Sequence, residues 1–456
     1  MPRARPSLLA LALFLAAPRA SAQQTSVYLP PSAVLTNYDR VLIGQEEALE
    51  SGAFVARVAD STAGWYNPAG LALVRRSVIG ASATGYELAT VDLGDIRTAS
   101  GKVSLAQLPS YFGAVLGGDV ISSDRWRIGF SATKPTSWST AVNGATPDGN
   151  AEVTYSSRVS ISTLVPAISA AWSARPSLRL GAGFGVAITS IFQTQILSVA
   201  TDPPYPQDFS VLRTADGTGT TWGGQGSLGV QWDITERLLF GASLRTPTFT
   251  IIRTGGLTFQ DSTIVHGTAG PTTDETYFND PDATFTYKLP LSLAFGLAWR
   301  EPRFDVEVDV RFHSAIPKYF LLSSTQPVTR VRAVPGGGQT VTTTAFPGLT
   351  YAANAVWNFS IGGRYQLDEA WSLHGGFYTD AAPSDPASTN VFRSVDLYGL
   401  TAGAKLKGDH LSGSLGLGLT WGHSNDFPLS DSGSVPFSTR LSILTVSLLY
   451  AIAYRF

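Results

Sequence analysis

The feature of this sequence that most constrains its fold is an alternation of apolar and polar side chains with a period of two residues. In residues 303–312, apolar and charged residues alternate without a break. This pattern is typical of a β-strand with one face in an apolar environment and the other in a polar one. About fourteen segments show it, at residues 77–88, 102–117, 125–138, 152–173, 178–191, 222–233, 238–252, 284–300, 303–313, 351–367, 370–379, 392–406, 411–423 and 438–456. Most are long enough for a tilted strand of about 9–11 residues to cross a bilayer.

The connections between these segments alternate in length. Short ones lie at residues 174–177, 234–237, 300–303, 368–370 and 407–410, and long ones at 192–221, 253–283, 314–350, 380–391 and 424–437. Outer-membrane barrels have short periplasmic turns and long external loops, whereas a soluble β-sandwich has no reason to alternate in this way. The sequence therefore predicts an all-β membrane protein, a 14-stranded antiparallel up-and-down outer-membrane β-barrel at residues 77–456.

Aromatic residues gather near the ends of the predicted strands. The tryptophans near the short connections are Trp126, Trp172, Trp232, Trp299 and Trp371, and those near the long ones are Trp138, Trp222, Trp357 and Trp421. Two such girdles are expected where rings lie at the level of the lipid headgroups.

The last predicted strand ends on an aromatic residue. Tyr450, Tyr454 and Phe456 share one face of this strand. We predict that these three residues form the signal that the barrel-assembly machinery recognises, and that outer-membrane lipid surrounds the folded barrel.

The first 22 residues have the composition of a cleaved signal peptide. Arg3 and Arg5 precede an apolar run at residues 8–17, and Ala20-Ser21-Ala22 forms a cleavage site. Ten apolar residues are too few to span a bilayer. We therefore expect residues 1–22 to direct export to the bacterial outer membrane and to be removed.

Residues 23–76 lack the alternation of the rest of the chain. Residues 45–59 have the spacing of a short helix, and a run rich in aromatic residues and Pro follows at residues 65–71. The lumen of a 14-stranded barrel is too wide for its own side chains to fill. The sequence therefore predicts an N-terminal extension and a small helical hatch that plugs the lumen.

Composition excludes several other classes of protein. Charged residues make up 14% of the chain, the net charge is −2 and there is no Cys. Without Cys there is no disulfide and no thiolate site for zinc or an iron–sulfur cluster. The absence of an overall basic charge argues against nucleic acid as a partner.

No constellation of residues predicts catalysis. The five His are dispersed, and zinc-protease and nucleophile-elbow motifs are missing. Ser372 and His374 point to the same face of one strand, but such a pair arises easily by chance. We expect no catalytic residue, metal site or cofactor.

Two stretches of the N-terminal region and the barrel pattern together resemble a known family. Residues 52–60 are followed by Tyr66-Asn67-Pro68-Ala69-Gly70-Leu71, and further similarity lies at residues 290–296 and 359–376. These segments resemble the FadL family of outer-membrane transporters for hydrophobic compounds. The resemblance implies a 14-stranded barrel whose helical N-terminal hatch carries the motif Asn67, Pro68 and Ala69.

The resemblance also implies a function. A hydrophobic ligand, a fatty acid or an aromatic hydrocarbon, is captured outside, enters the lumen and leaves sideways through the wall when the hatch shifts. Phe54, Trp65 and Tyr66 are candidate ligand contacts. Pro135 is a candidate gap in the wall, because Pro cannot donate a ladder hydrogen bond. The function expected first is uptake of long-chain fatty acids.

Other functions stay open at this point. They are a non-specific polar porin and a structural outer-membrane barrel, with an outer-membrane lipid hydrolase ranked below both. Charged residues on the lumen face either form ion-pair networks that hold the plug or bind a ligand carboxylate. They are Arg127, Arg245, Arg303, Asp305, Glu307, Asp309, Arg311 and Arg364.

Overall fold

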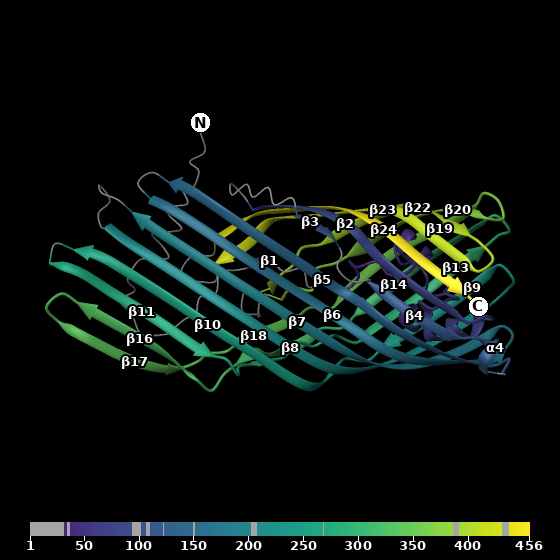
Figure 1. Ribbon diagram of the computed structural model, residues 1–456, viewed down its shortest axis with the longest axis horizontal. Coiled ribbons are helices and arrows are strands. Elements are labelled where there is room, and N and C mark those ends of the chain that lie inside the picture. The colour runs from purple at the N-terminus through teal and green to yellow at the C-terminus, as the bar shows by residue number, and fades with distance from the viewer. Residues whose placement is uncertain are drawn as a thin grey trace.

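The computed structural model describes residues 32–33, 37–93, 102–105, 110–121, 123–148, 151–201, 208–267, 269–385, 392–430 and 437–456. The expected signal peptide lies outside these residues. Within them, no helix is long and apolar enough to cross a membrane. The fold is an elongated β-barrel with short helices near the N-terminus of the described chain (Figure 1).

Fourteen strands form the barrel wall, as the sequence predicts. They are β2 (Val78–Leu93), β4 (Tyr111–Leu116), β5 (Trp126–Asp148), β6 (Ala151–Arg175), β7 (Leu178–Thr201), β8 (Asp208–Asp233), β9 (Leu238–Arg245), β13 (Ser292–Arg300), β14 (Phe304–His313), β19 (Val356–Gln366), β20 (Trp371–Asp380), β22 (Leu397–Lys407), β23 (Leu411–Ser430) and β24 (Phe437–Arg455). Each pairs antiparallel with its neighbour, and β24 closes the ring on β2. Closure leaves no free edge within the membrane.

The remaining elements lie inside the wall or extend it. The helices are α2 (Glu46–Leu49), α3 (Ala63–Tyr66), the 3-10 helix η1 (Pro68–Leu73) and α4 (Gly118–Ile121). The other strands are β1 (Ser32–Ala33), β3 (Lys102–Leu105), β10 (Phe249–Gly267), β11 (Gly270–Asp280), β12 (Thr284–Phe285), β15 (Ile316–Ser323), β16 (Pro327–Val334), β17 (Gly338–Ala345), β18 (Leu349–Ala353) and β21 (Phe392–Arg393).

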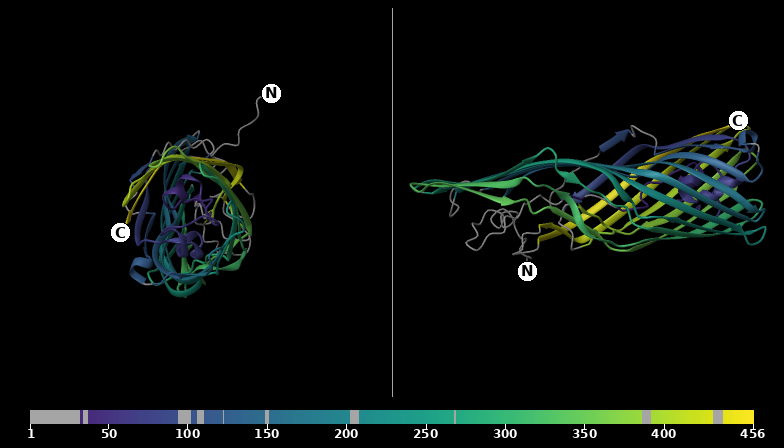
Figure 2. Two further views of the ribbon diagram at one scale, coloured as in Figure 1. Left: turned by 90° about the vertical axis from the view of Figure 1, so that its right-hand side faces the viewer. Right: turned by 90° about the horizontal axis from the view of Figure 1, so that it is seen from below.

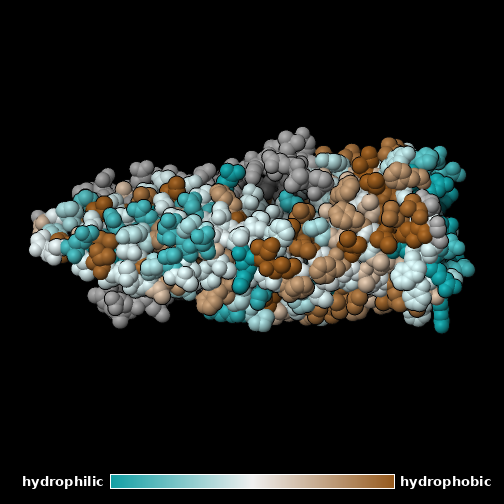
Figure 3. Space-filling model, turned by 60° about the horizontal axis from the view of Figure 1, so that its bottom comes forward, coloured by the Kyte–Doolittle hydropathy of each residue, from teal (hydrophilic) through white to brown (hydrophobic). Residues whose placement is uncertain are grey.

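The alternation along the strands separates a lipid face from a lumen face. In β14, Phe304 and Val308 are exposed, whereas Glu307 and Asp309 are completely buried inside the barrel. Apolar side chains form a broad belt around one half of the molecule, with a polar rim at its end (Figure 3). Aromatic pairs mark both borders of this belt: Trp126 and Trp172 stack at 6.1 Å, and Tyr398 and Trp421 at 6.2 Å. Trp138 is the exception to the predicted girdles, because it is buried in the interior.

Strands continue well beyond the belt on the external side. The sequence predicts external loops at residues 192–221, 253–283 and 314–350, but most of their described residues form strands. β10 pairs with β8 over almost its whole length, and β11 pairs with β16. Thr and other β-branched residues are frequent there, and they favour strands even where no apolar alternation identifies them. The result is an external β-sheet that ends at β17 (Figure 1).

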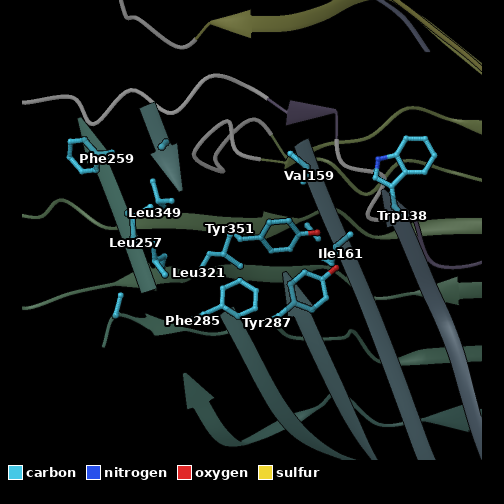
Figure 4. Packing of buried hydrophobic residues seen from close by; sticks show 14 of the residues in the cluster. Trp138, Val159, Ile161, Leu257, Phe259, Phe285, Tyr287, Leu321, Leu349 and Tyr351 are labelled. Carbon is cyan, nitrogen blue, oxygen red and sulfur yellow. The ribbon is translucent and has the colours of Figure 1, made fainter. Parts of the chain in front are cut away.

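An apolar cluster fills the interior above the belt. The small sheet β12–β15–β18 contributes Phe285, Leu321 and Tyr351, which face Ile161 and Leu257 of the opposing strands (Figure 4). Phe278 stacks on Phe259 at 5.3 Å and on Phe346 at 4.6 Å. Residues of β22 and β24 complete the cluster. Side chains therefore pack most of the external end of the lumen and leave an apolar cavity of about 40 Å³ beside Phe285, Leu321 and Leu349.

The apolar belt generates a first prediction. Leu417 in β23 and Val341 in β17 are both 58% exposed, the first in the belt and the second in the external sheet. Leu417→Arg is expected to lower the free energy of unfolding by about 2–4 kcal/mol, because it places a cation in hydrocarbon. Val341→Arg is expected to change it by less than about 0.5 kcal/mol. Urea titration of the barrel in lipid vesicles measures both values, and equal effects would contradict this placement of the membrane.

Candidate functional site

Residues 43–76, called the hatch from here on, lie inside the ring of strands (Figure 2). The sequence predicts a helix over residues 45–59, but only Glu46–Leu49 is helical. The helix cannot continue because Ser51 and Gly52 both adopt positive φ, 56° and 75°. The chain then turns so that the backbone N–H groups of residues 54–56 point to the wall.

Asn67 joins the two parts of the hatch to the wall. Its side-chain oxygen accepts a hydrogen bond from Ala69 N at 3.2 Å and caps η1. Its amide donates to the carbonyl oxygens of Val55 in the hatch and Val230 in β8, both at 2.8 Å. Pro68 occupies the first position of η1, where a missing N–H costs nothing. Asn has both the acceptor and the two donors that this completely buried position uses.

Glycines in the wall let the hatch lie directly against the barrel backbone. A Cβ at Gly181 would lie 2.3 Å from Ala69 N, and one at Gly362 would lie 2.2 Å from the carbonyl oxygen of Glu50. Similar close approaches occur at Gly229, Gly241, Gly376, Gly403 and Gly416. The hatch is therefore fitted closely to the wall on several sides.

Buried charges hold the N-terminal part of the hatch. Arg57 donates to Glu50 at 2.5 Å and to Glu307 of β14 at 2.8 Å. Glu307 also accepts from Ala56 N at 2.6 Å, and Asp309 accepts from Phe54 N at 2.9 Å. The wall carboxylates thus serve as acceptors for hatch backbone groups that have no helical partner. Of the two roles open to the charged lumen residues, Glu307 and Asp309 therefore have the first, which is to hold the plug.

Ser372, His374 and Glu50 form a chain of hydrogen bonds. His374 Nε2 lies 2.8 Å from Ser372 Oγ, and His374 Nδ1 lies 2.6 Å from Glu50 Oε1. The spacing resembles that of a catalytic triad, but Ser372 and His374 are only 5% exposed and Glu50 is completely buried. The sequence showed the Ser–His pair and missed Glu50, because 324 residues separate Glu50 from His374. We interpret the chain of bonds as an anchor of the hatch.

The same region contains a candidate group of metal ligands, Glu46, Glu50 and His374, whose ligand atoms lie within 4.8 Å of one another. Each is already engaged within the described chain. Glu46 pairs with Lys405, Glu50 with Arg57, and His374 with Ser372 and Glu50. These contacts occupy the three side chains and do not indicate a metal site.

Two neighbouring glutamates of α2 have opposite pKa shifts. Burial alone would raise the pKa of Glu46, but Lys405, His374 and Arg364 together hold it well below its usual range. Burial, reinforced by Asp60 and Glu46, raises the pKa of Glu47 well above its usual range. Glu47 accepts from Thr62 Oγ1 at 2.7 Å, and among the described residues no cation offsets its burial.

Residues 37–42, called the strap, cross the lumen above the hatch. Asn37 donates to the carbonyl oxygens of Asp380 at 2.7 Å and Val395 at 3.0 Å. Asp39 Oδ2 lies 3.0 Å from His313 Nε2, and Arg40 donates to the carbonyl oxygen of Ser137 at 2.7 Å. The strap therefore runs from the β20–β22 side of the barrel to β5. No local pattern in the sequence predicts these contacts, since each joins residues far apart in the chain.

A small cavity lies where the strap, the hatch and the wall meet. Its lining is Tyr38, Asp39, Val41, Leu42, Ser51, Gly52, Val55, Trp65, Tyr66, Pro135, Ser243, Arg245, Ser292, Leu293, Ala294, Arg311 and His313. Its volume of about 40 Å³ leaves room for only about three water molecules. Of the candidate ligand contacts, Trp65 and Tyr66 line the cavity. Phe54 does not, because it lies under the guanidinium of Arg57, with the Arg57 Cζ 4.2 Å from the ring centre.

Two cations face this cavity. Arg245 donates to the carbonyl oxygen of Trp65 at 2.6 Å, and its guanidinium lies over the Trp65 ring at 3.6 Å. Within the described chain no carboxylate lies within ion-pair distance of Arg245. Arg311 differs, since it pairs with Asp309 at 3.2 Å.

Pro135 lies at an irregular point of the wall. The pairing of β5 with β6 shifts register between Thr133 and Thr136, so that Lys134 and Pro135 form a β-bulge. Pro166 in β6 also lies in the wall but causes no shift between β6 and β7. The candidate gap therefore coincides with a local break in the ladder, and it borders the cavity.

The three C-terminal aromatic residues lie on the lipid face. Tyr450, Tyr454 and Phe456 are 45–56% exposed, and Tyr454 meets Phe456 at 5.1 Å. Phe456 N donates to the carbonyl oxygen of Ser77 at 3.0 Å, beside the β2–β24 seam. Their role as an assembly signal stays a prediction.

Comparison with known proteins agrees with this architecture. The sequence profile of the family described as Outer membrane protein transport protein (OMPP1/FadL/TodX) matches residues 42–408. The chain belongs to this family. It is an outer-membrane transporter for hydrophobic compounds, in a family that is not enzymatic. No curated protein sequence matches the chain.

Several solved structures share the fold of this FadL-family protein. A Pseudomonas aeruginosa FadL homologue has a TM-score of 0.59 and 15% identity, covering 92% of this chain and 100% of its own. The Ralstonia pickettii toluene transporter TbuX has a TM-score of 0.53 and 16% identity, covering 91% and 98%. The CymD monoaromatic hydrocarbon channel has a TM-score of 0.53 and 15% identity, covering 91% and 97%. At these identities the likeness establishes the fold alone.

The buried anchor generates a second prediction. Glu50→Ala removes the carboxylate that contacts both His374 and Arg57 and leaves Arg57 with Glu307 as its one ion-pair partner among the described residues, so the hatch is expected to lose about 3 kcal/mol of local stability. Hydrogen exchange of the hatch amides should then become faster by a factor of roughly 100 or more. The control is Asp274→Ala, which removes a partly exposed pair with Arg330. It should cost β11 less than about 1 kcal/mol, and an equal cost for both variants would argue against the anchor.

The raised pKa of Glu47 generates a third prediction. The pKa of Glu47 is higher in the folded than in the unfolded protein. The resulting contribution to the free energy of unfolding is fully present below the unfolded pKa, and it is lost as the pH rises through the folded pKa. Glu47→Gln, which keeps a neutral polar side chain, should therefore slow hydrogen exchange of the hatch at pH 7 relative to the parent. The difference should vanish below about pH 4. A variant that is less stable than the parent at pH 7 would show that Glu47 is held as a carboxylate.

Proposed function

We propose that this protein takes up long-chain fatty acids passively and releases them sideways through the wall at Pro135 when the hatch shifts. The observation that carries the proposal is the position of the cavity. It is bordered by the hatch residues Trp65 and Tyr66, by the bulge at Pro135 and by the cation of Arg245. The cavity of about 40 Å³ is too small for a fatty acid, so the hatch shift must enlarge it before a ligand tail and head group find these neighbours.

Arg245 gives the cavity a preference for an acidic head group. Its guanidinium is held in place by Trp65 and has no carboxylate partner in the described chain. A fatty-acid carboxylate could accept hydrogen bonds from it in a medium of low dielectric constant, where such bonds are strong. The apolar residues Leu293, Val55 and Pro135 line the same cavity and suit a hydrocarbon tail.

Lateral release suits a solute that dissolves in hydrocarbon and not in water. The hatch, the strap and the apolar cluster fill the described part of the lumen in this closed state. A shift of the hatch toward an exit through the wall lets the ligand enter the bilayer without crossing the aqueous periplasm. A polar porin needs a continuous water-filled lumen, so the filled lumen argues against that alternative. A purely structural barrel has no use for a cation facing a cavity.

Aromatic hydrocarbons are a second candidate class. Tyr351 meets Tyr287 and Tyr319, each with ring centres 5.9 Å apart, in the apolar cluster on the external side. Tyr38 of the strap lies in the cavity lining with its ring 4.7 Å from that of His313. Rings of this kind would stack on an aromatic ligand.

Uptake assays with cells that produce or lack the protein separate these functions. We expect protein-dependent uptake of a labelled long-chain fatty acid and no change for a small polar solute. Arg245→Ala should lower the ratio of fatty-acid uptake to toluene uptake by about tenfold, the value of one lost charge-assisted hydrogen bond. The ratio cancels any effect of the lost Arg245–Trp65 bond on the position of the hatch. Uptake of the polar solute alone would make the protein a porin.

The wall break generates a separate prediction. Pro135→Val gives residue 135 an N–H that can pair across the wall, so uptake of the fatty acid should fall severalfold. Pro166→Val is the matched control, because Pro166 is a wall proline outside the cavity. Both variants should assemble as the parent does, which heat-modified mobility on gels would report. Equal uptake by the two variants would place the exit elsewhere.

A further inference from the structure

The hatch consists of two parts that rest on different sides of the barrel. Residues 43–58, called the latch half, include α2 and contact β14, β20, β22 and β23, and their C-terminal end also reaches β8 and β9. Residues 61–74, called the leaf, include α3 and η1 and contact β5 to β8. Ala59, which is exposed, and Asp60 connect them.

The latch half is tied to the wall by charges. Arg57 pairs with Glu307 and Glu46 with Lys405, and Glu50 Oε1 lies within hydrogen-bond distance of His374 Nδ1. Neutral groups add to these pairs: Thr401 Oγ1 donates to the carbonyl oxygen of Leu49 at 2.6 Å, and Ser51 Oγ lies 2.9 Å from Thr401 Oγ1. Separating the latch half from the wall would leave several buried charges without partners, and such charges are costly.

The leaf is held differently. It packs on the wall through buried apolar residues such as Leu71 and Val74, and its polar contacts with the wall are hydrogen bonds that involve backbone carbonyl groups. Arg127 donates to Val74, Arg245 donates to Trp65, and Asn67 donates to Val230. Among the described residues no ion pair joins the leaf to the wall. Each of these bonds can be replaced by a bond to water and none is an ion pair, so the polar contacts of the leaf cost less to break than those of the latch half.

The leaf also covers the wall next to the bulge. α3 packs on β5 and β6, and Gly64 lies against Ser131 of β5. Trp65 and Tyr66 of α3 share the cavity with Pro135. Movement of the leaf away from β5 would therefore enlarge the cavity on the side of Pro135.

From this asymmetry we propose that the hatch opens as a hinged leaf. Residues 43–58 stay fixed on the wall through Glu50, Arg57 and Glu46, and residues 61–74 swing away from β5 to β8 about Ala59 and Asp60. Three hydrogen bonds between the halves must break or rearrange, Tyr66 to Ile43, Thr62 to Glu47, and Asn67 to Val55. The apolar cluster that the two halves share must rearrange with them. Glu50 is in this view a positioning residue. The inference rests on the proposed function for its purpose, but its geometry can be tested without transport.

The chain has no Cys, so paired cysteines can lock either half. Gly64→Cys with Ser131→Cys locks the leaf, because a Cβ at residue 64 lies 3.6 Å from that of Ser131, within the range of disulfides. Ser51→Cys with Thr401→Cys locks the latch half, where the two hydroxyl oxygens are 2.9 Å apart. The leaf lock should abolish fatty-acid uptake until a reductant is added. Because Ser51 lines the cavity, the latch lock is compared with the same double variant after reduction, and the oxidised and reduced forms should take up fatty acid equally. A block by both locks, or by the latch lock alone, would overturn the hinge, and so would uptake that continues with the leaf locked.

A second measurement needs no transported ligand. Ser131 lies under the leaf and Thr401 under the latch half, and they are similarly buried, at 3% and 5% exposure. In single variants Ser131→Cys and Thr401→Cys, a maleimide should label residue 131 at least about tenfold faster, because labelling follows local opening. Equal rates, or faster labelling of residue 401, would overturn the hinge. Faster labelling of residue 131 without any uptake would refute the proposed function and leave the hinge supported.

Discussion

The structure depends on one constraint, that backbone N–H and C=O groups in hydrocarbon must be paired within the protein. Fourteen strands satisfy it by closing on themselves through β2 and β24. Closure has a consequence, because a ring of this size encloses a lumen that the wall side chains do not fill. The hatch is the solution to that second problem. It brings its own unpaired backbone groups, and the wall provides acceptors for them.

The interior of the wall therefore has two kinds of position. At some, a carboxylate such as Glu307 or Asp309 accepts from the hatch backbone. At others, a glycine such as Gly181 or Gly362 lets the hatch backbone approach closely. Charges are concentrated on the β14 and β20–β22 side, and the β5–β8 side uses hydrogen bonds that involve backbone carbonyls. This unequal distribution of charge gives the plug a fixed side and a releasable side, and the bulge at Pro135 lies on the releasable one.

Much of the fold could be predicted from the sequence because the lipid and lumen faces alternate residue by residue. The alternation in β14 and the terminal alternation in β24 located those strands directly. The motif at Asn67 was also readable, although its partner Val230 was not. The sequence did not predict the strands that lie outside the membrane, because apolar and polar side chains need not alternate there. β10, β11, β16 and β17 lie outside the membrane, so they lack the apolar alternation and were expected to be loops. Trp138 is predicted in a girdle from its position along the strand, but that position does not tell whether its side chain faces lipid or the interior.

The sequence by itself determined the barrel, its strand count, the presence of a plug and the family resemblance. These follow from local periodicity, which each segment carries independently of the others. Only the tertiary structure decided how the plug is held. Glu50 meets His374, Asp39 meets His313 and Arg245 meets Trp65 across long stretches of chain. Contacts of this kind depend on the register and closure of the whole ring, and no local pattern in the sequence encodes them.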